Sequence, residues 1–263
     1  MQPVYGLTVL YDQLYIVRKE IPQVDVYDVN TFELTRHLAV YELIGPRDMT
    51  SCRKYECLYI VDCRLGGTIH RVQLNGQNHQ TTRWEMKGEE PAGISITSGA
   101  SNVLVTCGGL RKLIEYTSHG VVVREIRLDG SIPHPFHASQ LYGDIFVVHG
   151  EMFDELNRLC IVANDGSVKA SYGGAPGNTK GQLQRPRHLA IDMQGNILIA
   201  DCLNARVLIL KSSLVDGREL LTKREDGKRF DPRRLCFDES RTQLYIADYT
   251  NKDVLVFSYN VDI

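Results

Sequence analysis

Short apolar runs separated by polar turns recur along the whole 263-residue chain, and the pattern is clearest between residues 184 and 210. Pro186 precedes an apolar run at 189–191, a turn follows at 193–196, and two further runs occupy 197–200 and 207–210. Three short runs joined by tight turns predict an antiparallel β-meander. A single meander has two bare edges and only one apolar face, so it needs neighbouring units to be stable.

The chain supplies those units, because a proline opens a similar pattern six times. The prolines are 43 to 51 residues apart: Pro3, Pro46, Pro91, Pro135, Pro186 and Pro232. Three strand-like runs follow each proline, and five of the copies have a fourth run before the next one. Four strands in about 40–50 residues are typical of a propeller blade. We therefore predict an all-β fold in which residues 1–263 form a single six-bladed β-propeller. Helices should be nearly absent.

Two places depart from a regular ring. The fourth copy is longer than the others, and the excess lies in 150–158 and in a glycine-rich loop at 173–181. The sixth copy has only three strand-like runs, and no residues precede Pro3 to supply a fourth strand. We expect either a three-stranded last blade, or a fourth strand that comes from upstream residues of a longer chain, because a bare edge favours aggregation.

The fifth and sixth copies resemble NHL repeats. The matching features are Gly181 and Leu183 before Pro186, the run ending at Asp192, and the later Asp201, Asn204, Arg206 and Val207; Asp248, Asn251 and Val254 continue the pattern. The resemblance implies a propeller like the C-terminal one of tripartite-motif (TRIM-NHL) ubiquitin ligases, which recruits substrates and in some members binds single-stranded RNA. The RING, B-box and coiled-coil modules of those ligases are absent here, so we expect no ligase chemistry in this chain.

The Asp-x-x-Asn spacing at Asp201–Asn204 and Asp248–Asn251 has a local explanation. Such side chains bond to loop backbone two or three residues away. We interpret both pairs as turn locks rather than as acid–base pairs.

Composition restricts the class of protein. Apolar content of 43% and charged content of 24% are those of a soluble globular domain, and the net charge of −2 excludes a uniformly basic surface. No apolar run reaches the roughly 20 residues of a membrane span, and no signal peptide is recognisable. Seven cysteines in no metal-binding spacing, with Cys52 and Cys57 flanking a hairpin turn, favour reduced thiols in a cytoplasmic protein.

Candidate binding residues follow the repeat prolines and the second strands, which share one face around the channel in such propellers. This face is predicted to be basic, with acidic residues gathered at Glu151, Asp154 and Glu155. We expect a non-catalytic module without a cofactor that binds a protein or peptide partner here. The partner-binding residues that we predict are Arg47, Arg64, Phe136, His137, Arg187, His188, Arg206, Arg233, Arg234 and Tyr249. Inter-blade ion pairs are the alternative role for these arginines.

Two other functions remain open at this point. Single-stranded RNA could bind the same face if Tyr5, Phe136 and Tyr249 offered stacking surfaces. A metal-dependent lyase or hydrolase could be built on His137, His149 and His188, since three imidazoles can hold zinc with one position open. The amidating lyase resembles this second plan.

Overall fold

Each sequence repeat forms one antiparallel sheet in the computed structural model, which describes residues 1–64, 66–74, 79–86 and 88–258. The first three sheets comprise β1 (Val4–Leu10), β2 (Gln13–Arg18), β3 (Gln23–Asp28) and β4 (Leu34–Ala39); β5 (Pro46–Cys52), β6 (Cys57–Asp62), β7 (Thr68–Gln73) and β8 (Gln80–Glu85); and β9 (Pro91–Ile96), β10 (Val103–Cys107), β11 (Lys112–Tyr116) and β12 (Val122–Arg127).

The next two sheets comprise β13 (Pro135–Leu141), β14 (Asp144–His149), β15 (Asn157–Val162) and β16 (Val168–Gly174); and β17 (Pro186–Ile191), β18 (Ile197–Asp201), β19 (Arg206–Leu210) and β20 (Arg218–Leu221). The sixth has three strands in the described part of the chain: β21 (Pro232–Asp238), β22 (Gln243–Asp248) and β23 (Asp253–Ser258). A 3-10 helix at Cys202–Asn204 is the sole helix among the described residues.

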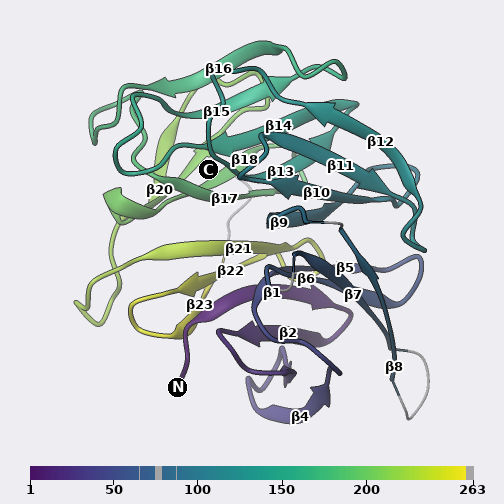
Figure 1. Ribbon diagram of the computed structural model, residues 1–263. Helices are drawn as coiled ribbons and strands as arrows, with labels where there is room; N and C mark the ends of the chain where they lie inside the picture. The colour runs from purple at the N-terminus through teal and green to yellow at the C-terminus, as the bar shows by residue number, and fades with distance from the viewer. Residues whose placement is uncertain (65, 75–78, 87, 259–263) are drawn as a thin grey trace.

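The six sheets are the blades of a six-bladed β-propeller, as the sequence predicts. The first strand of every sheet, from β1 to β21, lies on the inside and packs against the first strands of both neighbouring sheets, so the set closes around a central axis (Figure 1). The second strands are buried almost throughout: β6, β10 and β18 have no residue outside the core. Their continuous apolar runs reflect burial on both faces between adjacent blades.

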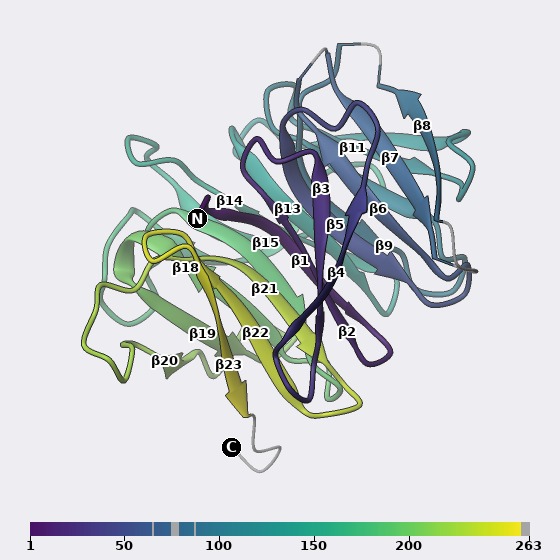
Figure 2. The ribbon, with the colours of Figure 1, turned by 90° about the horizontal axis from the view of Figure 1, so that it is seen from below.

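The ring closes by packing of the last blade on the first. Figure 2 shows β1 (purple) beside β21 and β22 (yellow). Their shared core contains Val4, Leu7 and Ile16 of the first blade and Tyr245 and Ala247 of the last. Full burial of an aliphatic side chain contributes about 1.5–3 kcal/mol. This apolar seam therefore holds the two ends of the ring together, and among the described residues no strand of one end pairs with the other.

Three smaller predictions can be compared with the structure. The glycine-rich loop begins later than predicted, because β16 extends to Gly174 and pairs with β15. Cys52 and Cys57 are cross-strand partners in the β5–β6 hairpin, as predicted. All seven cysteines are free thiols, and five of them are buried. No described helix is long and apolar enough to cross a bilayer.

Candidate functional site

The inner strands all carry a β-bulge at their second residue. In β5, Pro46 pairs with Asp62 and Asp48 pairs with Val61, which leaves Arg47 unpaired. The pairing register shifts by one residue at the same place in the other five blades. The residues left unpaired in the six blades are Tyr5, Arg47, Ala92, Phe136, Arg187 and Arg233. A bulge redirects one side chain out of the pleat. A proline opens five of these strands, and Pro3 directly precedes β1. Proline is tolerated at this end because the ladder needs no N–H there.

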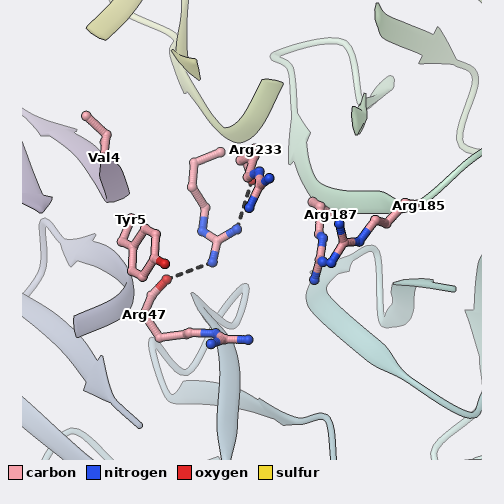
Figure 3. A pocket seen from close by; sticks show the side chains of 7 residues that line it. Val4, Tyr5, Arg47, Arg185, Arg187 and Arg233 are labelled. Atoms are coloured by element: carbon pink, nitrogen blue, oxygen red, sulfur yellow. Dashed lines mark hydrogen bonds between the residues drawn. The ribbon is translucent and has the colours of Figure 1, made fainter. Parts of the chain in front are cut away.

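Four of these bulged residues, Tyr5, Arg47, Arg187 and Arg233, meet at one pocket at the mouth of the channel. The arginine pocket has a volume of about 180 Å³ and is lined by Val4, Tyr5, Arg47, Arg185, Arg187, Arg233 and Arg234. Figure 3 shows the side chains of Arg185 and Arg187 on one side of the hollow and Tyr5 on the other. The sequence prediction named four of the five arginines, and the structure brings those four together.

The arginines of this pocket are only partly neutralised. Glu151 contacts both Arg185 Nε at 2.8 Å and Arg187 Nη2 at 3.1 Å. Asp231 binds Arg233, with Oδ2 at 3.1 Å from Nη2. Asp48 binds Arg234. Five guanidinium groups therefore face three carboxylates.

Arg47 and Arg187 retain unused donors. The guanidinium of Arg47 has no hydrogen bond or ion pair to any described residue, although its backbone oxygen accepts a bond from Arg234 at 2.7 Å. Arg187 is 8% exposed, and its Nε has no partner among the described residues. Burial lowers the pKa of Arg187 to about 10, although Glu151 opposes the shift, so the side chain stays cationic at neutral pH. These donors give the pocket a capacity to bind anions.

Below the pocket, the third residues of four inner strands form a group that we call the channel cluster. It consists of the buried Asp48, His137 and His188, and of Arg234, whose side chain is 11% exposed. Arg234 Nε donates to Asp48 Oδ1 at 3.1 Å. The rings of His137 and His188 stack with centroids 3.7 Å apart. In the other two blades the third residue is Gly6 or Gly93, where a Cβ atom would lie 2.7 Å and 2.5 Å from neighbouring backbone.

Electrostatics keep the channel cluster in one charge state. Burial works to raise the pKa of Asp48, but the charge of Arg234 and hydrogen bonding by His188 outweigh it and hold that pKa well below its ordinary value. Burial lowers the pKa of His137 and of His188, so both rings are neutral at physiological pH. The cluster is therefore an Arg–Asp ion pair flanked by two neutral imidazoles.

The channel cluster has the residue types of a metal site, but the imidazole nitrogens that face its centre carry protons. Asp48, His137 and His188 offer ligand atoms within 4.8 Å of one another. However, His188 Nδ1 accepts a bond from the Leu235 N–H at 3.3 Å, and His137 Nε2 lies 3.2 Å from the Ile94 carbonyl oxygen. Each ring must then carry its proton on Nε2, the atom nearest Asp48. No lone pair is left on either atom for a cation.

His149 is not part of this cluster, contrary to the three-histidine arrangement considered from the sequence. Its Nε2 accepts a bond from Arg158 Nε at 3.3 Å, and the side chain is fully buried. The residue ends β14, at the position that Asp62, Asp201 and Asp248 occupy in other blades. Those aspartates bond to loops: Asn204 Nδ2 donates to Asp201 at 2.8 Å and Asn251 Nδ2 to Asp248 at 2.9 Å. The predicted turn locks are thus confirmed.

The remaining predicted residues lie around the pocket or away from it. The Phe136 ring is covered by Arg187 at 3.9 Å and the Tyr249 ring by Arg233 at 3.5 Å. The side chain of Arg64 is 58% exposed and lies 3.5 Å from Glu20. Arg206 is buried and bound to Asp201 and Glu219, so it holds the fifth blade together.

Arg185 and the central role of Asp48 were missed by sequence reasoning. Arg185 precedes Pro186 with a φ of 58°, and no other copy has an arginine before its proline. Asp48 directly follows Arg47, in the same place relative to the proline as His137, His188 and Arg234. That shared position was the signal that could have identified it.

Comparisons with known proteins support the fold. No protein-family model and no curated protein sequence matches the chain. Among solved structures, hydrazine synthase from Kuenenia stuttgartiensis has a TM-score of 0.72 at 15% identity, over 100% of this chain and 97% of that one. A protein of unknown function from Bacteroides thetaiotaomicron has a TM-score of 0.77 at 11% identity, over 98% of this chain and 69% of that one.

A third similar structure is virginiamycin B lyase from Staphylococcus aureus, with a TM-score of 0.66 at 12% identity over 99% of this chain and 85% of that one. At these identities the likeness establishes the propeller fold alone. The fold supports interaction and scaffold functions in general, and it also occurs in enzymes.

Proposed function

We propose that this propeller is a recognition module whose arginine pocket binds an acidic segment of a protein partner. The observation that supports it most is the charge at the channel mouth, where five arginines meet and three carboxylates contact them. In a protein with a net charge of −2, such local excess favours an anionic ligand. From the NHL resemblance we further propose that the module recruits substrates within a larger protein of the ubiquitin-ligase type.

The two alternative functions have less support. RNA needs free aromatic faces, yet Tyr5 stacks on Tyr249 with centroids 6.1 Å apart, and arginines cover Tyr249 and Phe136. A central metal needs imidazole lone pairs that face it, whereas the Nδ1 lone pair of His188 accepts the Leu235 N–H and Nε2 of His137 donates to the Ile94 carbonyl oxygen. Preference for RNA is one outcome of the test below.

The test compares binding of a fluorescent glutamate-rich peptide pool and of its glutamine-substituted counterpart by fluorescence anisotropy. Wild type should bind the acidic pool with an affinity that falls as salt rises. Arg47→Ala should lose most of that binding and remain folded, because its guanidinium has no partner to lose among the described residues. Arg127→Ala, an exposed arginine of β12 outside the pocket, is the matched control and should bind normally. Equal binding of both pools, or preference for an RNA pool, would contradict the proposal.

A further inference from the structure

We infer that the arginine pocket takes the phosphate group of a phosphorylated side chain, with the adjacent residues of the partner lying in a second hollow beside it. This inference rests on the proposed function and specifies the ligand. It depends on four features of the site: its closed floor, its volume, its continuation in one direction, and its unused donors.

The floor of the pocket is closed by the channel cluster. Arg234 is fixed by Asp48 and by the backbone oxygens of Arg47 and Arg233, to which it donates at 2.7 Å and 2.9 Å. Beneath it, Asp48 is 1% and His137 3% exposed. A ligand must enter from the mouth and end there. A terminal phosphomonoester meets this condition, whereas an internal phosphodiester of RNA continues in both directions.

The volume suits one chemical group. At about 180 Å³ the pocket is well below the roughly 300–1,000 Å³ of sites that enclose a whole small molecule. It has room for a phosphate and part of the side chain that carries it. The remainder of the ligand must lie outside.

A second hollow offers that space. It measures about 460 Å³ and shares Arg47 with the arginine pocket; Glu151, which contacts Arg185 and Arg187, also lines it. We call it the adjoining hollow; its lining includes Arg64, Pro91, Ala92, Pro135 and Phe136. The lining also contains Arg47, Glu90 and Glu151. Such a mixture of apolar and charged side chains of both signs suits the residues that flank a phosphorylated position. A free phosphate ion would leave this space unused, so the arrangement favours a peptide.

The charge and the donors match a dianion. A phosphorylated side chain carries about −1.5 to −2 charge at neutral pH and three acceptor oxygens, against one charge and two oxygens for a carboxylate. The pocket has two more arginines than contacting carboxylates. Arg47 contributes a whole guanidinium without a partner among the described residues, and Arg187 a buried Nε without one. A guanidinium group can donate two parallel hydrogen bonds to two oxygens of one anion. A carboxylate has two oxygens and fits one such arginine, whereas the three oxygens of a phosphate can be shared by more than one.

The experiment measures anisotropy of labelled peptide pools with random flanking residues and one fixed central residue: phosphoserine, phosphotyrosine, glutamate or serine. Wild type should bind at least one phosphorylated pool on the order of tenfold more tightly than the glutamate pool. Arg47→Ala should remove that preference, and Arg127→Ala should keep it. Inorganic phosphate should compete, but much more weakly than unlabelled phosphopeptide.

The outcomes separate this inference from the proposed function. Equal affinity for the phosphorylated and glutamate pools, with both lost in Arg47→Ala, would overturn the inference and leave the proposed function standing. No binding of any acidic pool would overturn both. Phosphopeptide binding that survives Arg47→Ala would place the phosphate outside the pocket. Inorganic phosphate binding as tightly as the peptide pools would show that the adjoining hollow contributes nothing, which contradicts a peptide ligand.

Discussion

Arg234 of the sixth blade and Asp48 of the second blade form an ion pair across the central channel, with Nε of the arginine 3.1 Å from Oδ1 of the aspartate. The first blade lies between these two blades in the ring, so the pair joins strands that are not neighbours. Asp48 also accepts the backbone N–H groups of Met49 and Ile94 at 3.0 Å and 3.1 Å. One carboxylate thus ties together blades two, three and six beneath the proposed binding pocket.

Neutralising this carboxylate should destabilise the whole ring. Asp48→Asn leaves the buried charge of Arg234 without its partner, and such a loss costs about 3–5 kcal/mol of the free energy of unfolding. Urea denaturation of wild type and variant measures the difference. Asp12→Asn is the matched control, since Asp12 is 74% exposed and pairs with Arg241 at the surface. Its effect should stay below about 1 kcal/mol. Similar values for the two variants would show that the pair across the channel is not structural.

His149 should make the protein less stable in mild acid. Burial and, less strongly, Arg158 lower the pKa of His149 from 6.5 to about 4. The unfolded chain therefore binds a proton below about pH 6.5, while the folded one stays neutral until about pH 4. The stability that neutral His149 contributes is therefore fully present above pH 6.5 and is lost as the pH falls from about 6.5 to about 4. The total loss is on the order of 3 kcal/mol of the free energy of unfolding.

The variant His149→Gln tests this assignment, because a glutamine can still accept the bond from Arg158. Thermal unfolding between pH 4 and pH 7 should show a shallower loss of stability in the variant than in wild type. His70, His137 and His188 also have lowered pKa values and account for the slope that remains. An unchanged profile would mean that His149 is already protonated, or accessible to water, in the folded state.

Glu151 occupies two of the arginines that the ligand needs. Its carboxylate contacts Arg185 and Arg187, so it competes with an incoming anion. Glu151→Gln should raise the affinity for phenyl phosphate by up to about fivefold, the equivalent of about 1 kcal/mol for a partly exposed pair. Titration calorimetry measures the change. The control is Asp144→Asn in the same blade, which removes an ion pair with Lys169 and should have no effect. A weaker affinity in Glu151→Gln would indicate that Glu151 orders the arginines for binding instead.

We predict that Phe153, in the same loop as Glu151, contacts a bound peptide. Its side chain is 94% exposed, two residues beyond Glu151, in the loop that extends the fourth blade. Phe153→Ala should change the free energy of unfolding by less than about 0.5 kcal/mol. It should weaken phosphopeptide binding by about fivefold, as loss of an aromatic contact does.

Tyr142→Ala is the control for that change. Tyr142 is 81% exposed and follows β13 at the end opposite Pro135, away from the arginine pocket. Anisotropy measurements on the two variants should differ, with binding by Tyr142→Ala equal to that of wild type. Equal losses in both would point to a general effect of surface apolar residues.

Much of the architecture could be predicted from the sequence because one unit is repeated. A proline at or just before the first strand and a continuous apolar second run recur in each copy, and burial between blades explains why the second run is apolar. The position of Arg47, Arg187 and Arg233 could be predicted for the same reason, since each follows its proline. The proline is the one sequence feature that marks the β-bulge, which directs these arginines to the mouth of the channel.

What could not be predicted depends on contacts between distant copies. The pairing of Asp48 with Arg234 joins residues 186 positions apart, and the protonation of His188 depends on an N–H at Leu235. His149 seemed equivalent to a channel histidine, but it ends a second strand, where side chains bond to loops. Arg185 reaches the pocket through a left-handed backbone conformation that no repeat pattern indicates.

A crystal structure of the protein with phenyl phosphate tests the central claim most directly. We predict that the phosphate lies in the arginine pocket, with its oxygens about 2.7–2.9 Å from guanidinium nitrogens of Arg47 and Arg187. The phenyl group should point toward the adjoining hollow. Phosphate bound elsewhere on the propeller while the pocket stays empty would contradict the account.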